Sequence, residues 1–304
     1  MNPDLSVNIA GLKLKNPTIL ASGVLGISGK ALRRVADSGA GAVVTKSCGI
    51  DAREGFPNPT VVEVPCGLLN AFGLPNPGVE AIREEIAEAK GAKIPVIASV
   101  YGFSRNDYGE AARIAEEAGA DAVELNVSCP HVKEVGVEIG QKEDLVAEVT
   151  STVKSKVAVP VIVKLSPNVS DVVAMGVAAE RSGADALCAI NTVRAMAIDI
   201  DVKKPILGAK IGGLSGPAIK PIAVRCVFEL YEAVKIPIIG CGGVTGWQDA
   251  VEFLLAGAVA TQIGTAIMHK DLTVFKEIES GLANYMRDGG FRKLDELVGL
   301  AHRS

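Results

Sequence analysis

The sequence lacks a hydrophobic run that could cross a membrane. Of its 304 residues, 48% are hydrophobic, yet no run approaches the roughly 20 apolar residues that a spanning helix needs. Residues 1–7 include Asp4 and show neither the basic start nor the apolar stretch of a signal peptide. We therefore expect no membrane insertion and no export, and we expect the protein to work in the cytoplasm.

The sequence also lacks an excess of positive charge and any grouping of cysteines. Lys and Arg number 31 against 35 Asp and Glu, which gives a net charge of −4, so we expect no nucleic-acid partner. None of the six cysteines belongs to a CxxC motif or a Cys/His cluster. The sequence therefore lacks the patterns of zinc and iron–sulfur sites, and we expect the protein to bind no metal. We also expect its cysteines to be reduced thiols.

Aromatic residues are few, at 4%, whereas the chain has 33 glycines and many valines, isoleucines and alanines. Eight short apolar runs recur, at 18–22, 42–46, 96–100, 122–127, 161–165, 186–191, 238–241 and 261–264. They lack the alternation of a half-exposed strand, which indicates strands buried on both faces of a parallel sheet.

Amphipathic helices are predicted between these strands. Helical periodicity covers residues 79–90, 111–118, 145–156, 172–181, 221–234, 247–256 and 272–287. Four predicted helices close on nearly the same phrase, at 37–40, 117–120, 181–184 and 255–258, each with a Gly-Ala pair. Glycine suits the left-handed residue that follows a helix. This alternation predicts an α/β fold, a TIM (β/α)8 barrel formed by a single domain over 1–304. A doubly wound open sheet is the alternative, against which the missing early GxGxxG turn argues.

Other segments complete the predicted barrel. Residues 7–9 and 12–14, joined at Ala10-Gly11, predict an N-terminal β-hairpin that covers the bottom. Long connections follow the second and sixth strands, over 47–77 and 192–221, and a shorter one follows the fourth, over 129–143. Such βα loops lie at the C-terminal face, where barrel active sites are built.

Polar residues stand where the predicted strands end, and they include two lysines, Lys46 and Lys164. Burying two ammonium groups at one barrel mouth is costly without anionic partners, so we expect an anionic ligand; salt bridges to loop carboxylates are the alternative. Gly242-Gly243 and Gly264-Thr265 follow the last two strands, where many barrels hold a phosphate. Together these features suggest a phosphate-bearing cofactor, and a lysine near a flavin would stabilise its reduced ring.

Cys129 follows the fourth strand. A thiol at a strand's carboxyl end can act as a nucleophile or as a base, although an isolated cysteine is more often a packing residue. Asn126 and Ser128 are polar where a core strand should still be apolar, and Pro130 ends the strand. These neighbours favour the functional interpretation.

Taken in order, these motifs make the sequence resemble the dihydroorotate dehydrogenases, FMN-containing barrel enzymes of pyrimidine biosynthesis. The resemblance extends over essentially the whole chain and is carried by residues 21–23, 45–47, 70–74, 76–78, 126–130, 163–167, 191–192, 240–243 and 263–265. Residues 5–16 and 297–302 resemble the class 1B catalytic subunits.

The resemblance implies roles for individual residues. FMN would be held by Ser22, Lys46, Ser47, Asn126, Lys164, Ile190, Gly216, Gly242, Gly243, Gly264 and Thr265. Dihydroorotate would be held by Lys46, Asn70, Ala71, Phe72, Gly73, Leu74, Asn126, Asn191 and Thr192. Cys129 would be the base that takes the C5 proton while the C6 hydride passes to the flavin, and the loop after it would act as a lid.

The resemblance also implies a partner. Class 1B subunits pass electrons to NAD through a second protein that carries FAD and an iron–sulfur cluster, in an assembly of two catalytic and two partner chains. The alternatives are a self-sufficient enzyme that uses fumarate, a related FMN pyrimidine reductase, a Schiff-base aldolase that uses Lys164, and a barrel without catalysis.

Several residues outside this set also carry expectations. His131 and Ser99 stand where the family commonly has asparagine. Cysteines 48, 66, 188 and 226 are predicted to be packing residues, and Cys241 is predicted to line the flavin phosphate loop. His269 and His302 are predicted to face solvent.

Overall fold

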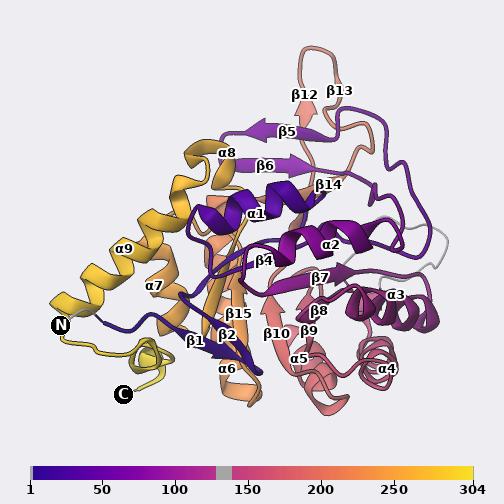
Figure 1. Cartoon of the computed structure of the whole chain (residues 1–304). Helices are drawn as coiled ribbons and strands as arrows, with labels where there is room; N and C mark the ends of the chain where they lie inside the picture. Colours follow the sequence, from indigo (N-terminus) through magenta and orange to yellow (C-terminus); the bar gives the residue numbers. More distant parts are fainter. Residues whose placement is uncertain (1–2, 128–138, 304) are drawn as a thin grey trace.

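The structure is a computed structural model that describes residues 3–127 and 139–303 (Figure 1). Eight parallel strands close into a barrel in the order of their sequence, which confirms the predicted TIM barrel. They are β3 (Thr18–Leu20), β4 (Ala42–Val44), β7 (Val96–Val100), β8 (Ala122–Asn126), β9 (Val161–Leu165), β10 (Ala186–Ala189), β15 (Ile238–Cys241) and β16 (Ala260–Ile263). Their register pairs Asn126 with Lys164 and Cys241 with Gln262.

A helix follows each barrel strand. In chain order these are α1 (Gly29–Asp37), α2 (Ile82–Lys90), α3 (Arg105–Glu117), α4 (Glu143–Lys154), α5 (Val172–Arg181), α6 (Lys220–Ala233), α7 (Trp247–Leu255) and α9 (Thr273–Asp288), with a short α8 (Ile267–Lys270) before the last. The predicted start of α3 at residue 111 is wrong. The helix begins earlier because Ser104 accepts a hydrogen bond from the Asp107 N–H and Asp107 reciprocates, forming a capping box.

The repeated glycines behave as predicted. Gly39, Gly119, Gly183 and Gly257 follow α1, α3, α5 and α7 with φ values of +113°, +97°, +95° and +113°. A left-handed residue at this position lets the chain reverse into the next strand. The need for a left-handed residue after each of these helices explains why the Gly-Ala pair recurs along the sequence.

The predicted N-terminal hairpin is confirmed as β1 (Val7–Ile9) and β2 (Leu12–Leu14). Its apolar side chains are buried with the barrel core, whereas Asn8 and Lys13 are exposed. Figure 1 shows the hairpin at the end of the barrel away from β5 and β6.

The two long connections contain a sheet that the sequence did not predict. Strands β5 (Val61–Val64) and β6 (Gly67–Asn70) come from the first, and β11 (Val193–Ala195) and β14 (Gly212–Ser215) come from the second. They pair in the antiparallel order β11-β14-β6-β5. The tip of the second connection is a small hairpin of β12 (Ile198–Asp199) and β13 (Lys204–Pro205), which projects away from the barrel (Figure 1).

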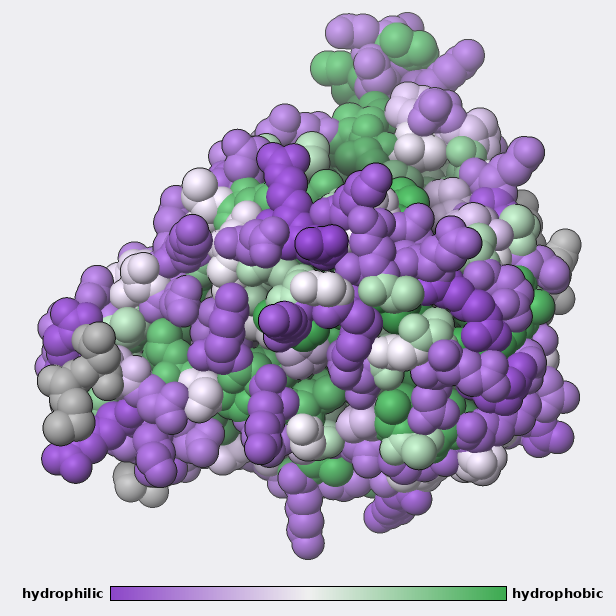
Figure 2. All heavy atoms as spheres, viewed as in Figure 1, coloured by the Kyte–Doolittle hydropathy of each residue, from purple (hydrophilic) through white to green (hydrophobic). Residues whose placement is uncertain are grey.

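Within 3–127 and 139–303, no helix is both long enough and apolar enough to cross a bilayer. In the same residues, no three His, Cys, Asp or Glu side chains gather in a way that could hold a metal ion. Hydrophilic side chains dominate the face in Figure 2, and the projecting tip mixes hydrophilic and hydrophobic side chains. Ile198, Ile200 and Val202 of the β12–β13 hairpin are exposed.

Candidate active site

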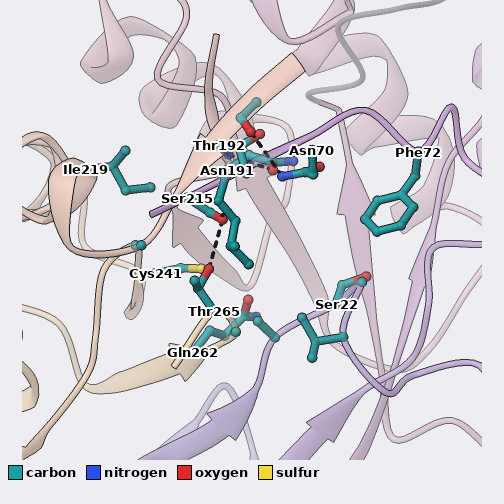
Figure 3. A pocket seen from close by; sticks show the side chains of 18 of the residues that line it. Ser22, Asn70, Phe72, Asn191, Thr192, Ser215, Ile219, Cys241, Gln262 and Thr265 are labelled. Carbon is teal, nitrogen blue, oxygen red and sulfur yellow. Dashed lines mark hydrogen bonds between the residues drawn. The ribbon is translucent and has the colours of Figure 1, made fainter. Parts of the chain in front are cut away.

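The candidate site is a cavity of about 480 Å³ between the carboxyl ends of the barrel strands and the four-stranded sheet (Figure 3). Sites for small molecules and cofactors typically measure ~300–1,000 Å³. Every predicted site residue that the structure describes lines this cavity: Ser22, Lys46, Ser47, Asn70, Ala71, Phe72, Gly73, Leu74, Asn126, Lys164, Ile190, Asn191, Thr192, Gly216, Gly242, Gly243, Gly264 and Thr265. Cys129 and His131 lie outside the described residues.

A chain of hydrogen bonds joins the polar ends of four barrel strands. The hydroxyls of Ser22 and Ser47 are 3.2 Å apart, and Asn126 Nδ2 donates to Ser47 Oγ over 3.1 Å. Asn191 Nδ2 donates in turn to Asn126 Oδ1 over 3.2 Å. Because these residues follow or end β3, β4, β8 and β10, the bonds fix polar groups from distant parts of the sequence relative to one another.

Two turns with glycine supply backbone N–H groups. Gly243 follows β15 with φ +73°, and a Cβ there would lie 2.7 Å from Lys220 Cβ and 2.8 Å from the carbonyl oxygen of Gly216, so the turn requires glycine. Among the described residues, no backbone hydrogen bond is donated by Gly243 or Thr265. The Thr265 hydroxyl donates to Ser215 Oγ over 2.8 Å (Figure 3). Backbone N–H groups without an acceptor at a cavity suit an anionic oxygen.

The four-stranded sheet forms the roof of the cavity. Asn70 Nδ2 donates to the carbonyl oxygen of Gly213 over 3.1 Å, which joins β6 to β14 beside the cavity. The Phe72 ring lies near Lys46, whose Nζ is 4.8 Å from the ring centroid, a distance suited to a cation–π contact. Asn168, which the sequence did not single out, donates from Nδ2 to the carbonyl oxygen of Thr192 over 3.1 Å.

Lys164 lies on the floor, inside the barrel. Its Nζ donates to Gln262 Oε1 over 2.7 Å and lies 3.9 Å from Glu124 Oε1. Burial by itself would lower the pKa of Lys164, but electrostatic attraction to Cys241 and Glu124 raises it above its ordinary value. The floor of the cavity therefore carries a charged ammonium group at neutral pH. The carboxylate near Lys164 therefore lies on a barrel strand, β8, and not in a loop as the salt-bridge alternative assumed.

The structure also shows the surroundings of Cys241 and Ser99. Cys241 lines the cavity, and its place at a flavin phosphate loop stays a prediction. A hydrogen bond with Cys188, aided by the nearby Lys164 ammonium, lowers the pKa of the Cys241 thiol. Ser99 is buried behind the wall, where its hydroxyl lies 2.9 Å from that of Ser47, and it does not line the cavity.

Two predictions outside the cavity are wrong. Cys66 is exposed in the turn between β5 and β6 and is not a packing residue, because that turn belongs to the unpredicted sheet. His302 does not face solvent. The chain end folds back over α6, so the His302 ring stacks on Phe228 at a centroid distance of 3.7 Å, and its Nε2 lies 3.1 Å from the Ala256 carbonyl oxygen. Cys48, Cys188 and Cys226 are buried and His269 is exposed, as predicted.

The sequence reasoning missed Glu124, Gln262 and Ser215, all of which line the cavity. Glu124 and Gln262 had a visible signal, since each interrupts an apolar strand with a polar side chain. Ser215 had none, because its position depends on the sheet that joins the two long connections.

Comparison with known proteins gives a consistent picture. A family model described as dihydroorotate dehydrogenase matches residues 4–286. The chain is 54% identical to a protein of Pyrococcus abyssi over 98% of its own length and 99% of the relative's. It is 50% identical to a protein of Methanocella arvoryzae, with 98% of each chain covered, and 52% identical to one of Methanothermobacter thermautotrophicus, again with 98% of each covered. All three relatives are named dihydroorotate dehydrogenase B (NAD(+)), catalytic subunit.

Proposed function

The chain belongs to the dihydroorotate dehydrogenase family, and on that premise we propose that it oxidises dihydroorotate to orotate in pyrimidine biosynthesis, with FMN as the hydride acceptor. One observation carries the proposal. A single cavity is lined both by glycine turns and a lysine suited to FMN and by amide side chains suited to dihydroorotate. The reaction requires the two molecules to lie in contact, and one shared cavity allows this.

The residues present fit FMN. The N–H groups of Gly243 and Thr265 would hold its phosphate, because both residues line the cavity and neither donates a backbone hydrogen bond among the described residues. Lys164 would lie at the ring, and the other proposed contacts are Ser22, Lys46, Ser47, Asn126, Ile190, Gly216, Gly242 and Gly264. When bound, FMN supplies the acceptor for the hydride that leaves C6 of the substrate.

The amide-rich part of the cavity fits dihydroorotate. Its ring presents N–H and C=O groups in pairs, which the side chains of Asn70, Asn126 and Asn191 can match as both donors and acceptors. Lys46 can bind the carboxylate, and Thr192 and residues 71–74 would complete the enclosure. Cys129 is the proposed base, since a thiolate can take the C5 proton.

The charge state of Lys164 separates this proposal from the aldolase alternative. A Schiff base requires a neutral amine that attacks a carbonyl. The raised pKa of Lys164 keeps its amine protonated, which suits stabilisation of negative charge and opposes nucleophilic attack. We therefore favour the flavin chemistry.

We further propose that electrons pass to NAD through a partner subunit with FAD and an iron–sulfur cluster, in an assembly of two catalytic and two partner chains that works in the cytoplasm. The relatives' names, which specify a catalytic subunit, support a partner. Leu25 and Met268 border the cavity and are 43% and 63% exposed. We expect the partner to cover this apolar rim, because electrons must leave from the cavity.

The purified chain tests the function. It should be yellow and release FMN on denaturation, and anaerobic addition of dihydroorotate should bleach the flavin absorbance. A protein that stays colourless after incubation with FMN contradicts the cofactor, whereas a yellow protein that is bleached by a uracil-type dihydropyrimidine but not by dihydroorotate favours the pyrimidine reductase.

The electron acceptor needs a separate assay. Without a partner, the chain should reduce artificial dyes but turn over slowly with NAD and with fumarate; rapid turnover with either contradicts the partner-dependent proposal. With the partner added, Met268→Asp should impair NAD reduction but not dye reduction. Ile200→Asp, at the 82% exposed tip of the β12–β13 hairpin, is the matched control and should impair neither.

A further inference from the structure

The barrel interior contains a carboxylate that the proposed reaction does not use. Glu124 lies on β8, is 0% exposed and borders the floor of the cavity. Its Oε2 accepts a hydrogen bond from Gln262 Nε2 over 2.5 Å. Its Oε1 has no hydrogen-bond partner among the described residues and lies 3.9 Å from Lys164 Nζ.

The order of groups fixes the orientation of the Gln262 side chain. An ammonium group can only donate and a carboxylate can only accept. Gln262 lies between them, so its amide oxygen must face Lys164 and its NH₂ must face Glu124, as observed. The alternative amide orientation would place a donor against a donor and an acceptor against an acceptor. Glu124 therefore determines that Gln262 presents its amide oxygen, and not its NH₂ group, to Lys164.

Packing alone does not account for this trio. A buried ion pair is often no more stabilising than apolar side chains of similar volume, and the strand positions beside Glu124 on β8 are apolar and fully buried. A buried charge with a specific partner at the floor of a cavity is more typical of a functional site.

We propose that Glu124 is a positioning residue that, through Gln262, holds the Lys164 ammonium against the FMN ring and limits how strongly that ammonium favours the reduced flavin. The proposal rests on the proposed function. Two-electron reduction adds negative charge to a flavin, which an ammonium group stabilises. A carboxylate behind the ammonium offsets part of this effect.

The two links of this arrangement give opposite predictions. Glu124→Gln keeps the shape but removes the negative charge, so the reduced flavin should become more favoured. Gln262→Met keeps both charges but removes the spacer, so Lys164 should close the 3.9 Å gap to Glu124 and move away from the ring. The reduced flavin should then become less favoured.

The measurement is the reduction potential of FMN bound to the holoenzyme, by equilibration with a reference dye. We expect each variant to change the reduction equilibrium at least tenfold, which is about 30 mV for a two-electron couple, upward for Glu124→Gln and downward for Gln262→Met. Glu63→Gln, the same exchange at an exposed position of β5, is the control and should leave the potential unchanged.

The outcomes separate the two proposals. A wild-type chain that binds no FMN overturns the proposed function. The role of Glu124 alone is overturned if FMN binding and bleaching are normal but the reduction equilibrium of both variants stays within threefold of wild type. Shifts of the same sign in both variants overturn it equally. If the melting curve shows that one variant does not fold, the sign of the potential shift in the other variant still decides whether Glu124 has the proposed role.

Discussion

The floor and the roof of the cavity are built in different ways. The floor belongs to the barrel, whose strands and helices share one continuous hydrophobic core. The roof is the four-stranded sheet, and among the described residues its separate apolar cluster has three buried members, Leu69, Ala71 and Leu207. Elements with few buried apolar contacts open locally at lower free energy than a large core. From this comparison we expect a rigid floor, which would hold the proposed FMN, and a roof that opens more easily and would admit the proposed substrate.

Removing the proposed base should cause the largest loss of activity. This change tests the proton transfer itself and not the construction of the floor or the roof. Cys129→Ala should retain FMN and lose dihydroorotate oxidation by roughly 10²–10⁴-fold, the usual contribution of a positioned base. The wild-type rate should rise with pH, since only the thiolate accepts a proton. Stopped-flow reduction of the flavin measures both; near-normal reduction by the variant would remove Cys129 from the mechanism.

A matched pair of leucine truncations compares the two cores directly. Leu32 on α1 and Leu69 on β6 are both almost fully buried. Leu32→Ala should lower the free energy of unfolding by about 2–5 kcal/mol. Leu69→Ala should change global stability by less, because the sheet can open without the barrel, and should raise the KM for dihydroorotate. Equal losses in denaturant unfolding would show that floor and roof form one cooperative unit.

The turn at Gly243 belongs to the floor, so a change there should weaken FMN binding. Gly243→Ala places a Cβ 2.7 Å from Lys220 Cβ at the proposed phosphate site, so we expect FMN to bind roughly tenfold to a hundredfold more weakly, consistent with the loss of one or two hydrogen bonds to an anion. Gly119→Ala is the control. It has a similar left-handed backbone, φ +97°, but no atom within 4 Å of the added Cβ. Fluorescence titration with FMN should separate them, and equal affinity in both variants would contradict the assignment.

A change in the roof should have the smallest effect. Asn70→Ala removes one amide at the cavity and should raise the KM for dihydroorotate about tenfold, the equivalent of one hydrogen bond of ~1.5 kcal/mol, while FMN affinity stays unchanged. Glu63→Ala, in the same sheet but away from the cavity, should alter neither. Loss of FMN from the Asn70 variant would mean that the roof also holds the cofactor.

The sequence by itself determined the barrel. Apolar strands, amphipathic helices and closing glycines are local signals, because each depends on residues close together in the chain. The same locality placed the polar strand ends at one mouth, since parallel strands in a closed barrel all point the same way. The part of the cavity lining that lies at the barrel strand ends was predictable for this reason, from Ser22 after the first strand to Thr265 after the last.

Only the tertiary structure decided the roof and the charge arrangement of the floor. β6 and β14 are short and lie in separate connections, and their pairing joins Asn70 to Gly213 across the fold. In the sequence, Glu124 and Gln262 are isolated polar residues in apolar strands. They contact Lys164 because closure of the barrel brings β16 within reach of β8 and β9 across the interior. Pairing and contact across the barrel depend on distances in space that no short window of sequence contains.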